Sequence, residues 1–212
     1  HELDDKLEIE LNYAFDSRRG YLTSCPTNVG TGMRASLMLH LPAIVMSGQI
    51  NGVFHTLGQL GMTVRGLYGE GTEMIGNLFQ LSNQITLGQS EDDINQNITS
   101  ISLRIVEQER LTREKLRSEM PYQLEDTIGR AYGILTNACL MTSNEALSLL
   151  SSVRLGIDMG IIKNIKLDAI NELIVAIRPA HLQKKVGQEM NPAQRDITRA
   201  RVIKERFANF SA

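Results

Sequence analysis

The first half of the chain mixes the hydrophobic patterns of strands and helices. Short β-type segments are predicted at 21–24, 35–41, 63–66 and 78–83, each bounded by glycine or polar turn residues. Residues 45–60 place apolar side chains at helical spacing, which predicts one helix despite three glycines. Strands joined by long loops and a helix indicate an α+β sheet domain.

The pattern becomes helical after Ser90. Ser90 and Asp93 form a capping box, and the isoleucines that follow lie at spacings of four, three and four residues, on one face of a long helix. Pro121 ends this helix. A boundary is therefore expected near 112–120, which divides the chain into a partial sheet domain over 1–115 and an all-helical domain over 116–212.

The second half carries several helix start and stop signals. They are the capping box Thr142/Glu145, a stop at Gly156, a short helix over 168–177 closed by Pro179, and a last helix opened by Asn191-Pro192 that runs to about Phe207.

Composition narrows the class. The chain has 212 residues, 42% of them apolar, with a net charge of −2 and a pI of about 6.1. These values favour a globular protein and argue against a general nucleic-acid or membrane binder. The longest apolar run, 37–46, is broken by His40 and Pro42, and no basic segment leads into an apolar one. Two cysteines predict no disulfide framework and favour a reduced, cytoplasmic setting. The acidic amphipathic start at His1 suggests that an N-terminal portion is missing.

The stretch CPTNVGTGMR, residues 25–34, is the first candidate site. Gly30 and Gly32 let backbone N–H groups approach an anion, and the Arg34 guanidinium matches a phosphate. On these residues alone, a tight turn with a surface arginine is the simpler interpretation.

The second candidate is the stretch RGLYGEG, residues 65–71. Arg65 ends a predicted strand, and Glu70 is the one carboxylate in the flexible loop that follows. Such a loop suits a lid over a cationic substrate. A solvated hairpin loop explains the same pattern.

The third candidate lies in the last predicted helix. Arg195, Asp196 and Arg199 share one helix face and could hold a doubly charged anion. The simpler interpretation is a solvated face with an internal salt bridge, which contributes little to stability.

Together, three motifs resemble the ATP:guanidino phosphotransferases, the family of creatine and arginine kinases. They occur in order as CPTNVGTGMRAS, RGLYGEG and SNQITLGQSE. The helical half resembles the branch that phosphorylates arginine in bacterial proteins, through VRLGID, NELIVAI, PAHLQ and RDITRA. The resemblance covers about 21–207 and implies an antiparallel sheet flanked by helices.

The resemblance implies roles for the first two candidate sites. Arg34 and Arg65 are expected to bind the phosphates of ATP, with Mg²⁺ bridging them. Cys25 and Glu70 are expected to be catalytic, beside the substrate guanidinium, with the Cys25 thiolate favoured by nearby cations. No metal site made of protein ligands is expected.

The resemblance also implies regulation and partners. Arg195 and Arg199 would bind the phosphoryl group of a phosphoarginine, and Asp196 its guanidinium. The expected partners are arginine-bearing protein substrates, a second copy of the chain, a zinc-binding activator protein and a Clp-type protease that receives the marked proteins. Nucleic acid and membrane are not expected as partners.

Several residues depart from the pattern of the small-substrate members. The family's Asn-Glu-Glu-Asp box is missing upstream of Cys25, which argues against activity of this chain alone. Met38 stands where those members often carry a histidine, and Thr86 where they carry an arginine. Tyr68 and Gly71 fit the protein-directed branch.

Two other functions therefore remain open: a kinase for a small guanidino compound, and a non-catalytic module that dimerises and binds phosphoarginine. The remaining residues of chemical interest receive ordinary interpretations. Cys139 is expected to be buried, His40 to be structural, and His55 and His181 to bind no metal.

Overall fold

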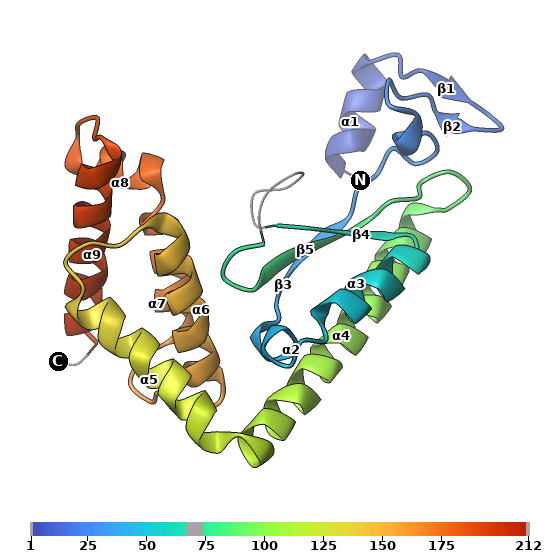
Figure 1. Ribbon diagram of the computed structural model, residues 1–212. Coiled ribbons are helices and arrows are strands. Elements are labelled where there is room, and N and C mark those ends of the chain that lie inside the picture. Colours follow the sequence, from blue (N-terminus) through green and yellow to red (C-terminus); the bar gives the residue numbers. More distant parts are fainter. Residues whose placement is uncertain (1, 67–73, 211–212) are drawn as a thin grey trace. The chain divides into compact units, whose positions relative to one another are not determined.

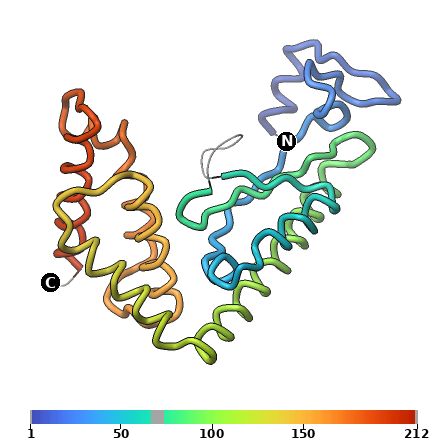
Figure 2. Tube along the Cα trace, viewed as in Figure 1, coloured from blue at the N-terminus to red at the C-terminus, as the bar shows by residue number. Residues whose placement is uncertain are grey.

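The computed structural model describes residues 2–66 and 74–210 (Figures 1 and 2). The chain divides into two compact units, each assembled from separate segments. The sheet unit comprises His1–Leu39, Ile50–Thr72 and Phe79–Glu107. The helical unit comprises His40–Gln49, Glu73–Leu78 and Gln108–Ala212. The predicted division at residue 115 remains a prediction about functional domains.

The sheet unit contains two small sheets with helices beside them. Its elements are α1 (Glu2–Glu10), β1 (Phe15–Asp16), β2 (Gly20–Tyr21), the 3-10 turn η1 (Pro26–Asn28), β3 (Ser36–His40), α3 (Ile50–Gln59), β4 (Met62–Arg65), β5 (Leu78–Asn83) and the first part of α4 (Glu91–Glu119). The last residue of β3 and the first of β5 belong to the helical unit.

The larger sheet has three strands in the order β3-β5-β4. β4 and β5 are antiparallel, with Met62 opposite Asn83 and Arg65 opposite Gln80. β3 and β5 are joined near their ends by hydrogen bonds from Asn83 N to Ala35 O (3.3 Å) and from Leu41 N to Asn77 O (2.9 Å). The two bonds show that β3 and β5 are antiparallel as well. The predicted strands at 35–41, 63–66 and 78–83 are confirmed, as is the antiparallel sheet with flanking helices.

One face of this sheet is apolar and covered by helices. Phe79 and Leu81 are buried, and the Phe79 ring meets Phe54 of α3 edge to face at 5.2 Å. Figure 1 shows α3 and the first part of α4 on the same side of the sheet. The buried Ile94 and Ile98 of α4 follow the predicted isoleucine face. The opposite, polar face of the sheet carries Ser36, which is exposed, Gln80, which is half-buried, and Ser82, which is buried.

The helical unit confirms the all-helical second half. It contains α2 (Pro42–Met46), the end of α4, α5 (Pro121–Asn137), α6 (Ser143–Asp158), α7 (Leu167–Ala176), α8 (Pro179–Val186) and α9 (Pro192–Ala208). α5 packs against α6 and α9, α6 also contacts α7 and α2, and α8 packs on α9. Fully buried Leu135, Leu150 and Ile170 belong to the core between these helices.

Most of the predicted caps are present. Ser90 and Asp93 bond each other reciprocally at the start of α4, and Asn191 forms a full capping box with Gln194 at the start of α9. The Thr142 hydroxyl accepts from Glu145 N at 3.2 Å. These side chains satisfy N–H groups that have no partner within their own helix.

Three local predictions are wrong. The helix predicted over 45–60 is two helices, because Gly48 adopts a left-handed φ of 72° between them. The strand predicted over 21–24 is limited to Gly20–Tyr21. Gly156 does not end α6; it lies inside the helix, where an added Cβ would come within 2.6 Å of Ile128 Cγ2. Gly156 therefore serves close packing of α5 on α6.

Within the described residues, no helix is both long enough and apolar enough to span a bilayer.

Candidate functional site

The cysteine loop, residues 25–34, connects β2 to β3 and carries its chemical groups on the outside. Cys25 and Arg34 are both exposed. The Cys25 Sγ lies 3.0 Å from Thr27 Oγ1, and Thr23 Oγ1 donates to the Cys25 carbonyl oxygen at 2.7 Å. The thiol and the guanidinium therefore remain accessible to a ligand while neighbouring hydroxyls fix the backbone.

Gly30 lets this loop approach the chain that follows β5. Its φ is 116°, and its amide bonds Tyr21 O at 3.2 Å. A Cβ at this position would lie 2.5 Å from Thr86 O and 2.8 Å from Leu87 Cα. Only glycine fits, because any side chain would overlap backbone atoms.

Thr86 holds the other side of the same contact. It is 5% exposed, and its Oγ1 lies 3.0 Å from Thr27 O and 2.8 Å from Val29 O. By family resemblance, Thr86 stands only for the loss of a phosphate-binding arginine. In the structure its hydroxyl fastens the 3-10 turn that follows Cys25.

Asn83 fixes the end of the loop and was missed by the sequence analysis. Its Oδ1 accepts from Ala35 N at 2.8 Å, and its Nδ2 donates to Met33 O (3.1 Å) and Ile85 O (3.3 Å). The side chain is almost fully buried. A buried amide that bonds three backbone groups sets the position of Arg34, which lies between two of them. An asparagine at the polar end of an apolar strand was the available signal.

The polar face of the larger sheet carries the phosphate-binding candidates, although Ser82 on this face is buried. Ser36 and Ser82 lie on this face, since their hydroxyl oxygens are 3.1 Å apart. Side chains alternate along a strand, so Gln80 and the half-buried Arg65 opposite it share this face. Arg34 enters β3 two residues before Ser36. The exposed arginine, the glycine loop and the polar face together suit a polyphosphate anion.

Glu70, with Tyr68 and Gly71, lies outside the described residues. The structure therefore does not test its predicted catalytic role. Among residues 2–66 and 74–210, no group of three His, Cys, Asp or Glu side chains could hold a metal ion.

The structure places the third candidate site in the protein interior. Arg199 is 1% exposed; its Nη1 lies 2.8 Å from Met141 O and 2.5 Å from Asp196 Oδ1. Its Nε donates to Ile177 O at 3.1 Å. The interpretation as a solvated helix face is wrong, because Arg199 joins the end of α7 and the start of α6 to α9.

Arg195 and Asp196 lie nearer the surface than Arg199. Arg195 is half-buried and donates from Nη1 to Met190 O at 2.8 Å, while the Asp196 side chain is 25% exposed. The motif thus brings together one buried cation, its carboxylate partner and one more accessible cation. Whether these groups bind a phosphoarginine remains a prediction.

Cys139 is exposed, so the prediction that it is buried is wrong. Its Sγ lies 3.8 Å from Lys204 Nζ, in the short connection between α5 and α6. The apolar residues before it in sequence lie at the end of α5, and Met141 after it is buried.

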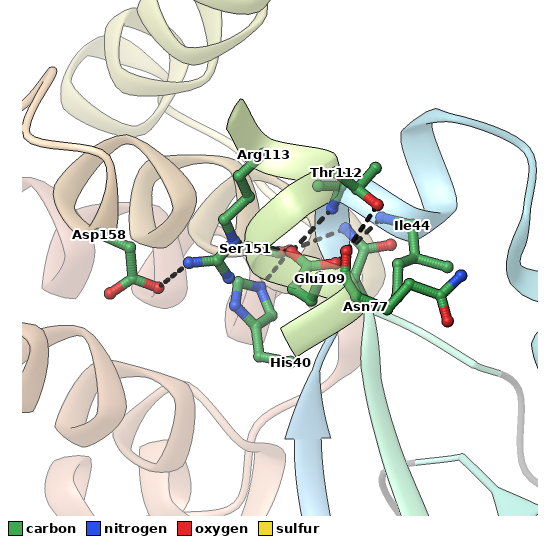
Figure 3. A network of polar contacts seen from close by, with 10 residues as sticks. His40, Ile44, Asn77, Glu109, Thr112, Arg113, Ser151 and Asp158 are labelled. Carbon is green, nitrogen blue, oxygen red and sulfur yellow. Dashed lines mark hydrogen bonds and ion pairs between the residues drawn. The ribbon is translucent and has the colours of Figure 1, made fainter. Parts of the chain in front are cut away.

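The helical unit also contains a buried polar network (Figure 3). Glu109, 3% exposed, accepts from Ala43 N and Ile44 N at 3.0 Å each. Arg113 donates to both Glu109 (2.8 Å) and Asp158 (3.1 Å). The Glu109 carboxylate is therefore satisfied by the first turn of α2 and by one guanidinium.

His40 belongs to this network and has the expected structural role. Its Nε2 lies 2.8 Å from Ser151 Oγ. Burial, then the positive charges of Arg154 and Arg113, lower the pKa of His40 to about 3. The imidazole is therefore neutral at physiological pH.

Comparison with known proteins gives the family to which this sheet and cysteine loop belong. Residues 1–112 match the ATP:guanido phosphotransferase C-terminal catalytic domain, and residues 121–212 match the C-terminal domain of the protein-arginine kinase McsB. The chain belongs to the ATP:guanido phosphotransferase family.

Two curated relatives of the chain are both named protein-arginine kinase. The chain is 68% identical over 206 residues to the protein-arginine kinase of Syntrophomonas wolfei. The match covers 97% of this chain and 57% of the relative. The chain is 56% identical over 205 residues to that of Moorella thermoacetica, covering 97% and 59%. The chain thus spans less than two thirds of the length of these relatives. Among solved structures, lombricine kinase aligns with a TM-score of 0.44 and 26% identity, over 50% of this chain and 29% of that one.

Proposed function

We propose that this chain is the C-terminal part of a protein arginine kinase, which transfers the γ-phosphoryl group of ATP to arginine side chains of proteins. The relatives named protein-arginine kinase match nearly the whole chain, including its helical half. The observation that carries the proposal is the exposed Cys25 and Arg34 on a loop fixed by Thr86 and Asn83.

The residues present fit the chemistry of this reaction. ATP supplies the phosphoryl group, and Mg²⁺ would accompany its phosphates, as is usual for nucleotide sites. Arg34 and Arg65 would neutralise phosphate charge beside the polar face of the sheet. Cys25 would present its sulfur to the substrate guanidinium, and Glu70 would align that group and accept a proton from it. A protonated guanidinium is a poor nucleophile, so the reaction would need both the Cys25 sulfur and the Glu70 carboxylate beside it.

A regulatory site is proposed on α9. Arg195 and Arg199 would bind the phosphoryl group of a phosphoarginine, with Asp196 on its guanidinium. The half-buried Arg195 is the cation that a ligand reaches with the least rearrangement, because Arg199 already bonds two carbonyls.

The family resemblance supports a wider proposal. We propose a cytoplasmic homodimer that acts on arginine-bearing proteins, works with a zinc-binding activator protein, and marks its substrates for a Clp-type protease.

Labelled phosphoryl transfer tests the proposed activity. The chain, alone and preceded by the N-terminal segment of the Syntrophomonas wolfei relative, is incubated with γ-labelled ATP, Mg²⁺ and an unstructured protein such as casein. The proposal predicts acid-labile label on arginine, assigned by mass spectrometry, in at least the longer protein. A tenfold excess of free arginine should leave the label largely unchanged.

Two results would contradict this proposal. Absence of arginine phosphorylation by the folded longer protein would remove the kinase and leave the non-catalytic module. Efficient transfer to free arginine or creatine instead of casein would assign the chain to the small-substrate kinases.

A further inference from the structure

Helix α6 is bonded to the ends of two strands of the catalytic sheet. Ser151 of α6 accepts a hydrogen bond from Asn77 Nδ2 at 2.8 Å, and its Oγ lies 2.8 Å from His40 Nε2 (Figure 3). His40 is the last residue of β3, and Asn77 directly precedes β5. All three residues belong to the helical unit.

This contact is close and buried. Ser151 is 2% exposed, and an added Cβ on Gly76, beside Asn77, would come within 3.0 Å of Leu147 O on α6. The backbone pair Leu41 N to Asn77 O, at 2.9 Å, closes the ladder at the same point. Three chain segments therefore meet at a single hydroxyl with little room for displacement.

A second connection reaches α6 through charged groups. Arg113 joins Glu109, which caps α2 directly after β3, to Asp158 near the end of α6. Glu109 and Asp158 are both paired with Arg113, and the positive charges of Arg154 and Arg113 act on the imidazole. A neutral His40 can share the Ser151 hydroxyl as donor or acceptor without burying a further charge.

The strands held at this point carry the polar face of the sheet. Met38 lies two residues before His40 on β3, and by strand alternation it shares a face with Ser36. Gln80, opposite Arg65, lies three residues after Asn77. Strands are stiff over such distances, so moving their ends moves the face that Arg34 and Arg65 serve.

We propose that Ser151 is a positioning residue for the nucleotide site, holding β3 and β5 in the arrangement that presents their polar face to ATP. This inference rests on the proposed function. It makes α6, which lies in the part matched by the McsB C-terminal domain, a component of the catalytic scaffold.

Substitution on both sides of the contact tests the proposal. Ser151→Ala and His40→Leu remove it, while His40→Gln keeps a group that can bond Ser151. Ser148→Ala is the matched control, an exposed serine on the same helix. Mg·ATP affinity is measured by calorimetry at a temperature where circular dichroism shows every variant folded. Hydrogen exchange of the Leu37 and Leu39 amides, which face β5 by alternation from Leu41, is measured on the same proteins.

The first two variants should bind Mg·ATP about 3–10-fold more weakly, the effect of losing one hydrogen bond, and should exchange faster in β3. His40→Gln and Ser148→Ala should stay within about twofold of the parent. A purely structural Ser151 would lower the melting temperature and leave both readouts unchanged, which would overturn the proposal. If the parent binds no nucleotide, the ATP site itself fails, and the exchange rates alone decide whether α6 holds β3.

Discussion

The cysteine loop and the RDITRA motif use their arginines in opposite ways. In the loop, Arg34 is exposed, and the buried residues Asn83 and Thr86 hold the loop backbone in place. In the motif, Arg199 is itself the buried residue that holds helix ends together. An arginine is thus accessible to a ligand in one region and holds the fold together in the other. A motif match alone does not distinguish these cases.

The largest effect is expected from removing the buried cation. Arg199→Ala leaves the Met141 and Ile177 carbonyl groups without this donor and Asp196 without its ion pair. We expect a loss of about 3–5 kcal/mol in the free energy of unfolding, measured in urea. Arg201→Ala, an exposed arginine on the same helix, should change it by less than about 0.5 kcal/mol. A small effect of Arg199→Ala would show that the motif is not structural.

Acid should act next, and through the helical unit. The pKa of His40 is lowered from 6.5 to about 3, so the unfolded chain binds a proton that the folded chain resists. Stability from this group is complete above pH 6.5 and is lost as the pH falls toward 3. Between pH 7 and 4.5 the expected loss is up to about 2.7 kcal/mol.

The control for this pH dependence is His40→Gln. Its unfolding free energy should vary less with pH than that of the parent by about this amount. An unchanged slope in the variant would show that His40 is not the group responsible.

A smaller effect is expected in the cysteine loop. Thr86→Val keeps the shape of the side chain and removes its hydroxyl from Thr27 O and Val29 O. We expect a loss of about 1–2 kcal/mol in stability and faster hydrogen exchange at the Gly30 amide. Thr56→Val, on an exposed α3 hydroxyl that bonds its own helix, is the matched control. Unchanged exchange at Gly30 would mean that Thr86 does not hold the loop.

Periodic and local signals were enough to predict much of the fold. The strand at 78–83 is found with its predicted bounds, and the cap Asn191 and the break at Pro121 occur where their chemistry requires. The helix over 45–60 failed at Gly48, because apolar periodicity continues through a left-handed glycine. Gly156 was read as a stop, since the sequence does not show that α5 approaches it so closely.

The site was less predictable than the fold. Cys25 and Arg34 could be proposed from the glycine loop and the family resemblance. Asn83 and Thr86 could not, because their partners, apart from Ile85 O, are backbone groups 48 to 59 residues away in sequence. The burial of Arg199 also depends on distant carbonyls of Met141 and Ile177. Long-range contacts of this kind leave no periodic signal.

Calorimetric titration of Mg·ATP into the parent, Arg34→Ala and Arg18→Ala tests most directly whether the exposed loop arginine serves the ligand. Both arginines are exposed in the sheet unit, so neither substitution should change stability by more than about 0.5 kcal/mol. The account predicts that Arg34→Ala binds about 10–100-fold more weakly, the effect of losing a charged hydrogen bond, and that Arg18→Ala binds like the parent. Equal affinities in the two variants, or a folded parent that does not bind Mg·ATP, would contradict it.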